Sequence, residues 1–169
     1  GPMGKDPEDV WDKRRHRNVK GRVHRTQSLL PRLLKAARPE DPARVVNVGS
    51  GMGEVPKGTA TYSYAVSKGA VHHMTRVLSN DLAPEFITVN AIAPGPFPSK
   101  MTDFALGSEE GRAESAKGVP LGRVGTAEDI AGALQFLCSR AGAYVSGAIL
   151  PLSGGMQSAA PISIFNEDL

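Results

Sequence analysis

The residues of this 169-residue chain best suited to chemistry are Tyr64 and Lys68, which lie four positions apart. In a helix this spacing places both side chains on one face. A phenol is a poor acid or base at neutral pH, but a nearby cation lowers the pKa of a phenol by stabilising the phenolate. The pair therefore suits general acid–base catalysis. Taken alone, the spacing also fits an exposed pair on a helix surface.

A serine can join this pair. Ser50 follows a short β-branched run at residues 44–48, and the glycines beside it indicate a tight turn. Ligands lie at the carboxyl ends of strands in a parallel α/β sheet, so a hydroxyl, a phenol and an ammonium would meet at one edge. Tyr62 competes with Tyr64, but Val66 stands four residues after it and leaves it without a lysine partner.

Hydrophobic periodicity predicts helices and strands in alternation. Helices are expected over residues 13–37, 64–82 and 127–137. Strands are expected over residues 44–48, 86–92 and 148–152. Residues 96–118 read as a long irregular connection with room for one short helix. Because no hairpin signal separates the strands, the pattern predicts an α/β fold with a parallel sheet and helices on its faces.

The first and last of these helices carry more specific signals. In the first, an apolar stripe is expected at Val19, Val23, Leu30 and Leu34, and Pro31 should kink or divide the helix. In the last, Thr126 is the expected N-cap, and Asp129 at the third helical position resembles half a capping box.

The composition excludes several classes of protein. Cys138 is the single cysteine, so an internal disulfide or an all-cysteine zinc site is ruled out, and its apolar helical setting predicts a buried residue rather than a nucleophile. The histidines show no metal-ligand spacing, and no metal is expected. The chain has no apolar run of about 18 residues and no secretory signal, so we expect a reducing, cytoplasmic compartment and no membrane.

The length fits one domain, expected over residues 4–156 and followed by a tail at 157–169. Gly1-Pro2-Met3 resembles the scar that a protease leaves before a start methionine, and we exclude it from fold reasoning.

Positive charge is concentrated in the first helix. Residues 13–39 hold ten Lys or Arg and no Asp or Glu, whereas the rest of the chain holds ten basic and 17 acidic residues. Such a block is typical of a solvated helical face or of a surface for a polyanion. Nucleic acid is the less favoured partner, because no zinc finger or aromatic-interleaved RNA motif accompanies the block.

Five ordered motifs, spread over residues 11–156, resemble the short-chain dehydrogenase/reductase family. They are an Asn-containing helix at 18–21, a catalytic-serine strand at 44–50, a catalytic helix at 64–70, the strand and turn beside the nicotinamide at 89–95, and a last strand at 147–155. Residues 94–102 are similar to 3-oxoacyl-carrier-protein reductase-like members of that family.

The resemblance implies an NAD(P)-dependent oxidoreductase that reduces a carbonyl, such as a 3-oxoacyl group, or oxidises an alcohol by hydride transfer. Tyr64 would be the general acid or base. Lys68 would favour the phenolate and hydrogen-bond the nicotinamide ribose, while Ser50 would hold and polarise the carbonyl. Asn18 would kink its helix and anchor a water that relays protons towards Lys68.

The same resemblance implies how the nicotinamide is bordered. The expected residues are Ile92, Pro94 and Gly95, with Ser99 where the family often has a threonine for the carboxamide.

The sequence departs from the family before the serine strand. No glycine triplet of the strand–turn–helix type precedes residue 49, and residues 49–53 carry the wrong spacing for one. The resemblance therefore covers strands five to seven of the family order, a truncated Rossmann-like sheet of about three parallel strands. Only the nicotinamide end of NADP or NAD is expected to bind. The edge where strand four normally lies would be unpaired and prone to association.

A catalytically silent, truncated family member remains the alternative, acting as an interaction module through its basic helix and exposed sheet edge. Family members are commonly dimers or tetramers, so a homo-oligomer or another chain completing the fold is expected beside a small-molecule substrate. Arginines occupy positions that are typically apolar in the family. We expect them to face water, carboxylates or an anionic partner: Arg14, Arg15, Arg17, Arg22, Arg25 and Arg32.

Overall fold

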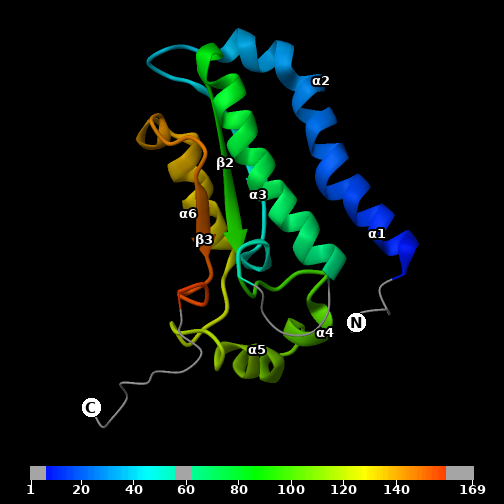
Figure 1. Cartoon of the computed structure of the whole chain (residues 1–169). Helices are drawn as coiled ribbons and strands as arrows, with labels where there is room; N and C mark the ends of the chain where they lie inside the picture. Colours follow the sequence, from blue (N-terminus) through cyan, green and yellow to red (C-terminus); the bar gives the residue numbers. More distant parts are fainter. Residues whose placement is uncertain (1–6, 56–61, 159–169) are drawn as a thin grey trace.

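The computed structural model describes residues 7–55 and 62–158. Three parallel strands form one sheet in the order β1 (Ala43–Val48), β2 (Ile87–Pro94) and β3 (Ile149–Leu152). Helix α3 (Tyr62–Leu82) packs along β2, and α6 (Ala127–Cys138) contacts β1. The predicted parallel α/β architecture with flanking helices is confirmed (Figure 1). The expected tag remnant at residues 1–3 lies outside the described residues.

The N-terminal helix is interrupted at the turn that contains Asn18, the residue expected to kink it, and not at Pro31. It comprises α1 (Glu8–Arg15), a π-helical turn at His16–Lys20, and α2 (Gly21–Ala36). Helix α1 and the π-helical turn contact α3, and α2 contacts β1. The predicted division at Pro31 is wrong, because α2 continues through it. Pro31 lies on the exposed side, where water can satisfy the backbone group that the missing N–H leaves unpaired.

The inner face of α2 also differs by one residue from the predicted stripe. Leu30 and Leu33 pack against the core cluster of Ala43, Leu82, Ile87 and Val89, whereas Leu34 is 42% exposed. Positions three and four residues apart are both neighbours on a helix surface. With leucines at both 33 and 34, periodicity alone could not choose between them.

The long connection after β2 holds two short helices rather than one. They are α4 (Asp103–Leu106) and α5 (Glu109–Ala116). The second begins at Ser108, whose Oγ accepts a hydrogen bond from the Gly111 N–H at 3.0 Å. A serine cap of this kind satisfies an orphan backbone donor and is a local signal that periodicity does not capture.

Helix α6 begins as predicted, but the burial of its last residues differs from the prediction. The Asp129 carboxylate accepts the Thr126 N–H at 2.8 Å, so the carboxylate half of the capping box is formed. At the other end Leu137 is buried, but Cys138 is exposed, and the expectation of a buried cysteine is wrong. Consecutive residues on a helix point about 100° apart, so an apolar neighbourhood in sequence does not bury both.

One edge of the sheet is open in the described part of the chain. The Ala43 N–H bonds to the carbonyl of Phe86, just before β2, and the Gly49 N–H bonds to the Ile92 carbonyl in β2. The alternating residues Val46 and Val48 therefore direct their backbone groups away from β2. No strand among residues 7–55 and 62–158 pairs with that side of β1. Val48, at the end of this edge, is 45% exposed.

None of the described helices is both long and apolar enough to cross a bilayer. Nor do the described residues bring three histidine, cysteine or acidic side chains together in a way that could hold a metal ion.

Candidate active site

The site forms where β1 and β2 end and α3 begins. Ser50 stands two residues after β1 and is buried, and it caps a 3-10 turn at Gly51–Gly53. Its Oγ accepts the Met52 N–H at 3.3 Å. The strand end and the turn together set the position of the Ser50 hydroxyl.

Tyr64 and Lys68 lie on one face of α3, as their spacing predicts. The Lys68 Nζ lies over the Tyr64 ring, 5.5 Å from its centroid. Lys68 is buried, and its Nζ donates a hydrogen bond to the Val48 carbonyl oxygen at 2.9 Å. Because Val48 is only two residues before Ser50, this bond ties the ammonium to the strand end that carries the serine.

Asn18 lies in the π-helical turn that interrupts the N-terminal helix, and its side chain is buried. Its Nδ2 donates to the Ser67 Oγ at 3.0 Å, and that hydroxyl in turn donates to the Tyr64 carbonyl oxygen at 2.8 Å. The irregular turn thus brings Asn18 against the helix that carries the phenol and the ammonium. π-helical turns of this kind are frequent at functional sites.

The residues expected beside the nicotinamide sit at the end of β2. Ile92 is paired in register with Val48, and its carbonyl accepts the Gly49 N–H at 2.7 Å. The Gly95 N–H bonds to the Leu152 carbonyl at 2.8 Å, and Pro94 pairs with that same residue of β3.

Close packing favours glycine at position 95, since a Cβ there would lie 3.0 Å from the Ser153 Cα. Ser99 lies further along the loop, is exposed, and its Oγ lies 2.9 Å from the Thr102 Oγ1.

Sequence reasoning missed Arg22 as part of this site. Its guanidinium donates to the Val48 carbonyl oxygen at 3.1 Å, while its Nε is buried with no hydrogen-bond partner among the described residues. Burial lowers the pKa of Arg22, and the charge of Arg25 acts in the same direction. The guanidinium is thus half-buried against a backbone carbonyl, and the expectation that it faces water or a carboxylate is wrong. The position of Arg22 one turn after Asn18 in the same helical segment was the available signal.

The site is electropositive. Burial lowers the pKa of Lys68 from 10.5 to about 8, and the nearby charges of Arg22 and Arg17 add to the shift. Lys68 remains mostly protonated at neutral pH, so two cationic groups converge on one carbonyl oxygen beside the phenol.

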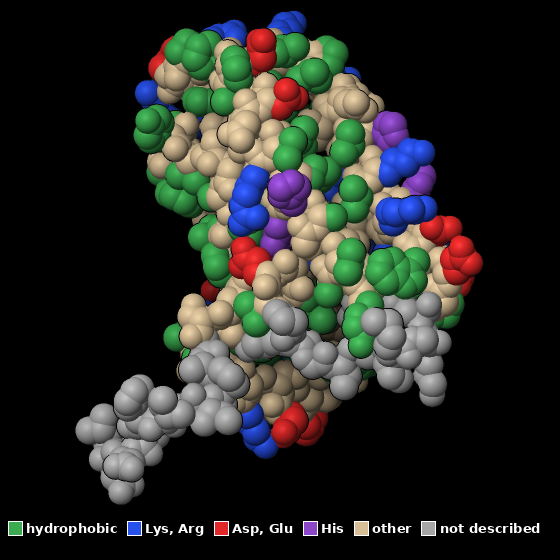
Figure 2. Space-filling model, viewed as in Figure 1, with side chains coloured by type: hydrophobic (Ala, Val, Ile, Leu, Met, Phe, Trp, Pro, Cys, Tyr) green, Lys and Arg blue, Asp and Glu red, His purple; other side chains and the backbone are tan. Residues whose placement is uncertain are grey.

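The other basic side chains of the N-terminal helix have more ordinary settings. Arg15 pairs with Asp12 at 2.9 Å, and Arg14 donates to the Ser63 Oγ at the start of α3. Arg17, Arg25 and Arg32 are exposed, as expected. Figure 2 shows Lys, Arg and His side chains along the side of the molecule formed by α1 and α2, with carboxylates at its lower end.

Comparison with known proteins agrees with the fold and the motifs. The family described as Enoyl-(Acyl carrier protein) reductase matches residues 1–157. The chain belongs to the short-chain dehydrogenase/reductase family and is similar to its 3-oxoacyl-carrier-protein reductases.

Two relatives illustrate the range of this similarity. The chain is 39% identical over 149 residues to the rhamnolipids biosynthesis 3-oxoacyl-[acyl-carrier-protein] reductase of Pseudomonas aeruginosa, covering 88% of this chain and 58% of the relative. It is 37% identical over 141 residues to a cyclohexanol dehydrogenase of a Rhodococcus species, covering 83% of this chain and 50% of that relative.

Solved structures show the same fold. An active-site complex of Pseudomonas aeruginosa RhlG with NADP matches with a TM-score of 0.87 at 37% identity, covering 93% of this chain and 61% of that one. A Burkholderia cenocepacia gluconate 5-dehydrogenase in complex with NADP and tartrate matches with a TM-score of 0.83 at 27% identity, covering 95% and 61%. The chain therefore spans between half and two thirds of the length of these proteins.

Proposed function

We propose that this chain carries the catalytic portion of an NAD(P)-dependent oxidoreductase, which reduces a carbonyl or oxidises an alcohol by hydride transfer. The observation that carries the proposal is the placement of the Lys68 ammonium over the Tyr64 ring, tied to the strand end that leads into Ser50. The 3-oxoacyl-carrier-protein reductase among its relatives supports a 3-oxoacyl substrate.

Each side chain has a role in reduction. The Tyr64 hydroxyl donates its proton to the carbonyl oxygen, and the Lys68 ammonium stabilises the phenolate that remains. The Ser50 hydroxyl donates a hydrogen bond to the same oxygen and holds it near the phenol. Asn18 supports the helix that carries these groups and is suited to anchoring a proton-relaying water. In alcohol oxidation the proton moves in the opposite direction, onto the phenolate.

The residues present fit one end of a nicotinamide dinucleotide. An ammonium and a phenol converge beside the ends of β1 and β2, which suits the hydroxyls of the nicotinamide ribose. Ile92, Pro94, Gly95 and Ser99 would border the ring and its carboxamide. Bound NADPH or NADH supplies the hydride. The diphosphate and adenosine ends find no glycine-rich strand–turn–helix in this chain.

The open edge of β1 supports a partner that completes the fold, either a second copy or another chain bearing the nucleotide-binding strands. Exposed apolar side chains on the helices give a second copy a surface to cover. They include Leu29 and Leu34 on α2 and Val66 and Val77 on α3.

A catalytically silent interaction module is the second candidate. The observation that favours it is that Lys68 and Arg22 both engage the Val48 carbonyl beside this open edge, an arrangement that would stabilise the edge without any chemistry. A nucleotide titration separates the two candidates.

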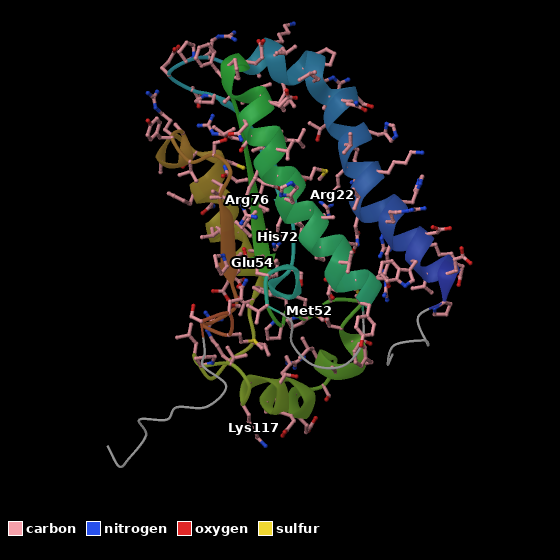
Figure 3. The ribbon with its side chains drawn as sticks, in the orientation of Figure 1. Arg22, Met52, Glu54, His72, Arg76 and Lys117 are labelled. Atoms are coloured by element: carbon pink, nitrogen blue, oxygen red, sulfur yellow. The ribbon has the colours of Figure 1, made fainter. Side chains whose placement is uncertain are left out.

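The experiment follows nucleotide fluorescence as NADPH and NADH are titrated into the full chain. Saturable binding that Lys68→Ala weakens is expected for the oxidoreductase. Lys117→Ala is the matched control, because Lys117 is exposed on the far side of α5 (Figure 3). Absence of binding up to millimolar nucleotide would favour the interaction module.

A further inference from the structure

A buried histidine lies behind the serine turn and has no part in the proton transfer described above. His72 is one helical turn beyond Lys68 on α3, and its side chain is 2% exposed. Its Nε2 accepts a hydrogen bond from the backbone N–H of Ser50 at 3.3 Å. In Figure 3 His72 lies between Arg76 and the turn that carries Met52 and Glu54.

The turn is built around this imidazole. A Cβ at Gly49 would overlap the His72 Nε2, and a Cβ at Gly53 would lie 2.8 Å from its Cε1. Glycines on both sides of Ser50 therefore let the ring approach the backbone closely. The imidazole fills the space behind the serine, and the absence of side chains at Gly49 and Gly53 lets it reach the Ser50 amide.

The hydrogen bond determines which nitrogen carries the proton. A neutral imidazole has one donor and one acceptor, so an Nε2 that accepts requires the proton on Nδ1. The Nδ1 has no hydrogen-bond partner among the described residues and lies 3.9 Å from the Glu54 Oε1. A second proton would sit on Nε2, where it would face the Ser50 N–H donor directly.

We propose that His72 is a positioning residue for Ser50: its neutral imidazole anchors the serine turn through the Ser50 amide, and protonation of the ring releases that turn. The catalytic consequence rests on the proposed function, because it requires Ser50 to hold the carbonyl. The anchoring of the serine turn by His72 does not depend on the proposed function.

Burial of the His72 side chain favours its neutral form. Burial lowers the pKa of His72 from its ordinary 6.5; Glu54 opposes the shift, while Arg76 and Lys68 reinforce it. These groups come from the serine turn and from α3, and β2 carries no charged residue. Because the native pKa lies below 6.5, the anchoring bond persists at neutral pH and is lost as the pH falls through the native value.

The test is an NMR titration of the full chain with 15N-labelled histidine and backbone amides. At neutral pH the His72 imidazole should show a proton on Nδ1 and none on Nε2. The Ser50 amide should titrate with the same midpoint as His72, below 6.5. A proton on Nε2 at neutral pH, or a Ser50 amide that does not follow His72, would overturn the proposal, and this reading of the wild type needs no variant to fold.

Variants add a rescue test. In His72→Leu the Ser50 amide should lose its hydrogen-bond shift and its titration. His72→Gln, which keeps an acceptor at that reach, should restore the shift without the titration. His73→Gln is the matched control, because His73 is the adjacent residue and is exposed. If His72→Leu leaves the Ser50 amide unchanged, the proposal is wrong.

A kinetic arm separates this inference from the proposed function. If the chain reduces a carbonyl, wild-type kcat should fall as His72 becomes protonated, by about tenfold, within the roughly 100-fold that a misplaced group can cost. His72→Gln should lose that acid limb, and His73→Gln should keep it. If kcat of His72→Gln still fell at low pH, the proposed effect of His72 on catalysis would be contradicted. NMR anchoring without any reduction would instead leave His72 correct and the proposed function wrong.

Discussion

Arg22 and Lys68 donate hydrogen bonds to the same backbone oxygen, that of Val48, at 3.1 and 2.9 Å. Two cations from different helices thus meet at the open edge of β1. The arrangement links the electrostatics of the proposed active site to the stability of the sheet edge, and several measurements can separate the two.

The first prediction concerns the charge on Lys68. Replacing Arg22 by glutamine should raise the pKa of Lys68 above its native value of about 8, because Arg22 is one of the cations that lower it. The measurement is an NMR titration of labelled lysine side chains. Arg32→Gln, which removes the same charge from an exposed position of α2, should leave the pKa of Lys68 unchanged. Equal effects of the two variants would contradict the prediction.

Stability should depend on pH through the same lysine. The pKa of Lys68 is about 8 in the folded chain and ordinarily 10.5, so the unfolded chain binds its proton more tightly. The contribution of Lys68 to stability is therefore fully present above pH 10.5 and is lost as the pH falls towards 8. Denaturant unfolding gives the free energy of unfolding of wild type and of Lys68→Met at each pH in this window. The rise of that free energy with pH that Lys68 causes should appear in wild type and be missing in Lys68→Met. Parallel curves for the two proteins would refute it.

Removing the phenol should abolish most catalysis without disturbing the fold. If the chain, alone or with a completing partner, reduces a carbonyl, Tyr64→Phe should slow turnover by about 100-fold to 10,000-fold, the usual contribution of a general acid. Tyr62→Phe is the matched control, because Tyr62 is 40% exposed and lacks a lysine one turn further on. A Tyr64→Phe variant that kept wild-type kcat would show that the proton comes from another group.

The open edge should become more prone to association when Arg22 is removed. A charged side chain along an unpaired strand discourages pairing with other chains. Arg22→Ala should therefore increase light scattering on concentration, whereas Arg32→Ala should not. No difference between them would mean that the guanidinium does not protect β1.

The end of α6 offers a test of packing. Leu137→Ala should lower the free energy of unfolding by about 2–5 kcal/mol, because the side chain is fully buried and its loss leaves a cavity. Cys138→Ala should change the free energy of unfolding by no more than about 0.5 kcal/mol, as expected for an exposed position. Denaturant unfolding measures both, and a larger cost at Cys138 than at Leu137 would contradict this packing.

Local patterns in the sequence predict the order of the three strands and the long helices, but not the second short helix after β2, and the same patterns carry the family resemblance. The β-branched runs before Gly49 and before Pro94 form parallel strands, and the spacing of Tyr64 and Lys68 places them together on α3. These features are local. Strand propensity, helical periodicity and turn residues act within a few positions of the chain, so they can be read without knowing what lies opposite.

Which side chains share a hydrogen-bond partner follows from tertiary packing and not from local sequence patterns. Arg22 looked like a solvated cation, and His72 looked like one of several histidines without a ligand set. The Val48 oxygen that draws in Arg22 lies 26 positions away, and the Ser50 amide that anchors on His72 lies 22 positions away. Such contacts depend on how α2 and α3 pack against the end of β1. Packing geometry follows from the whole core, and residue spacing along one element does not contain it.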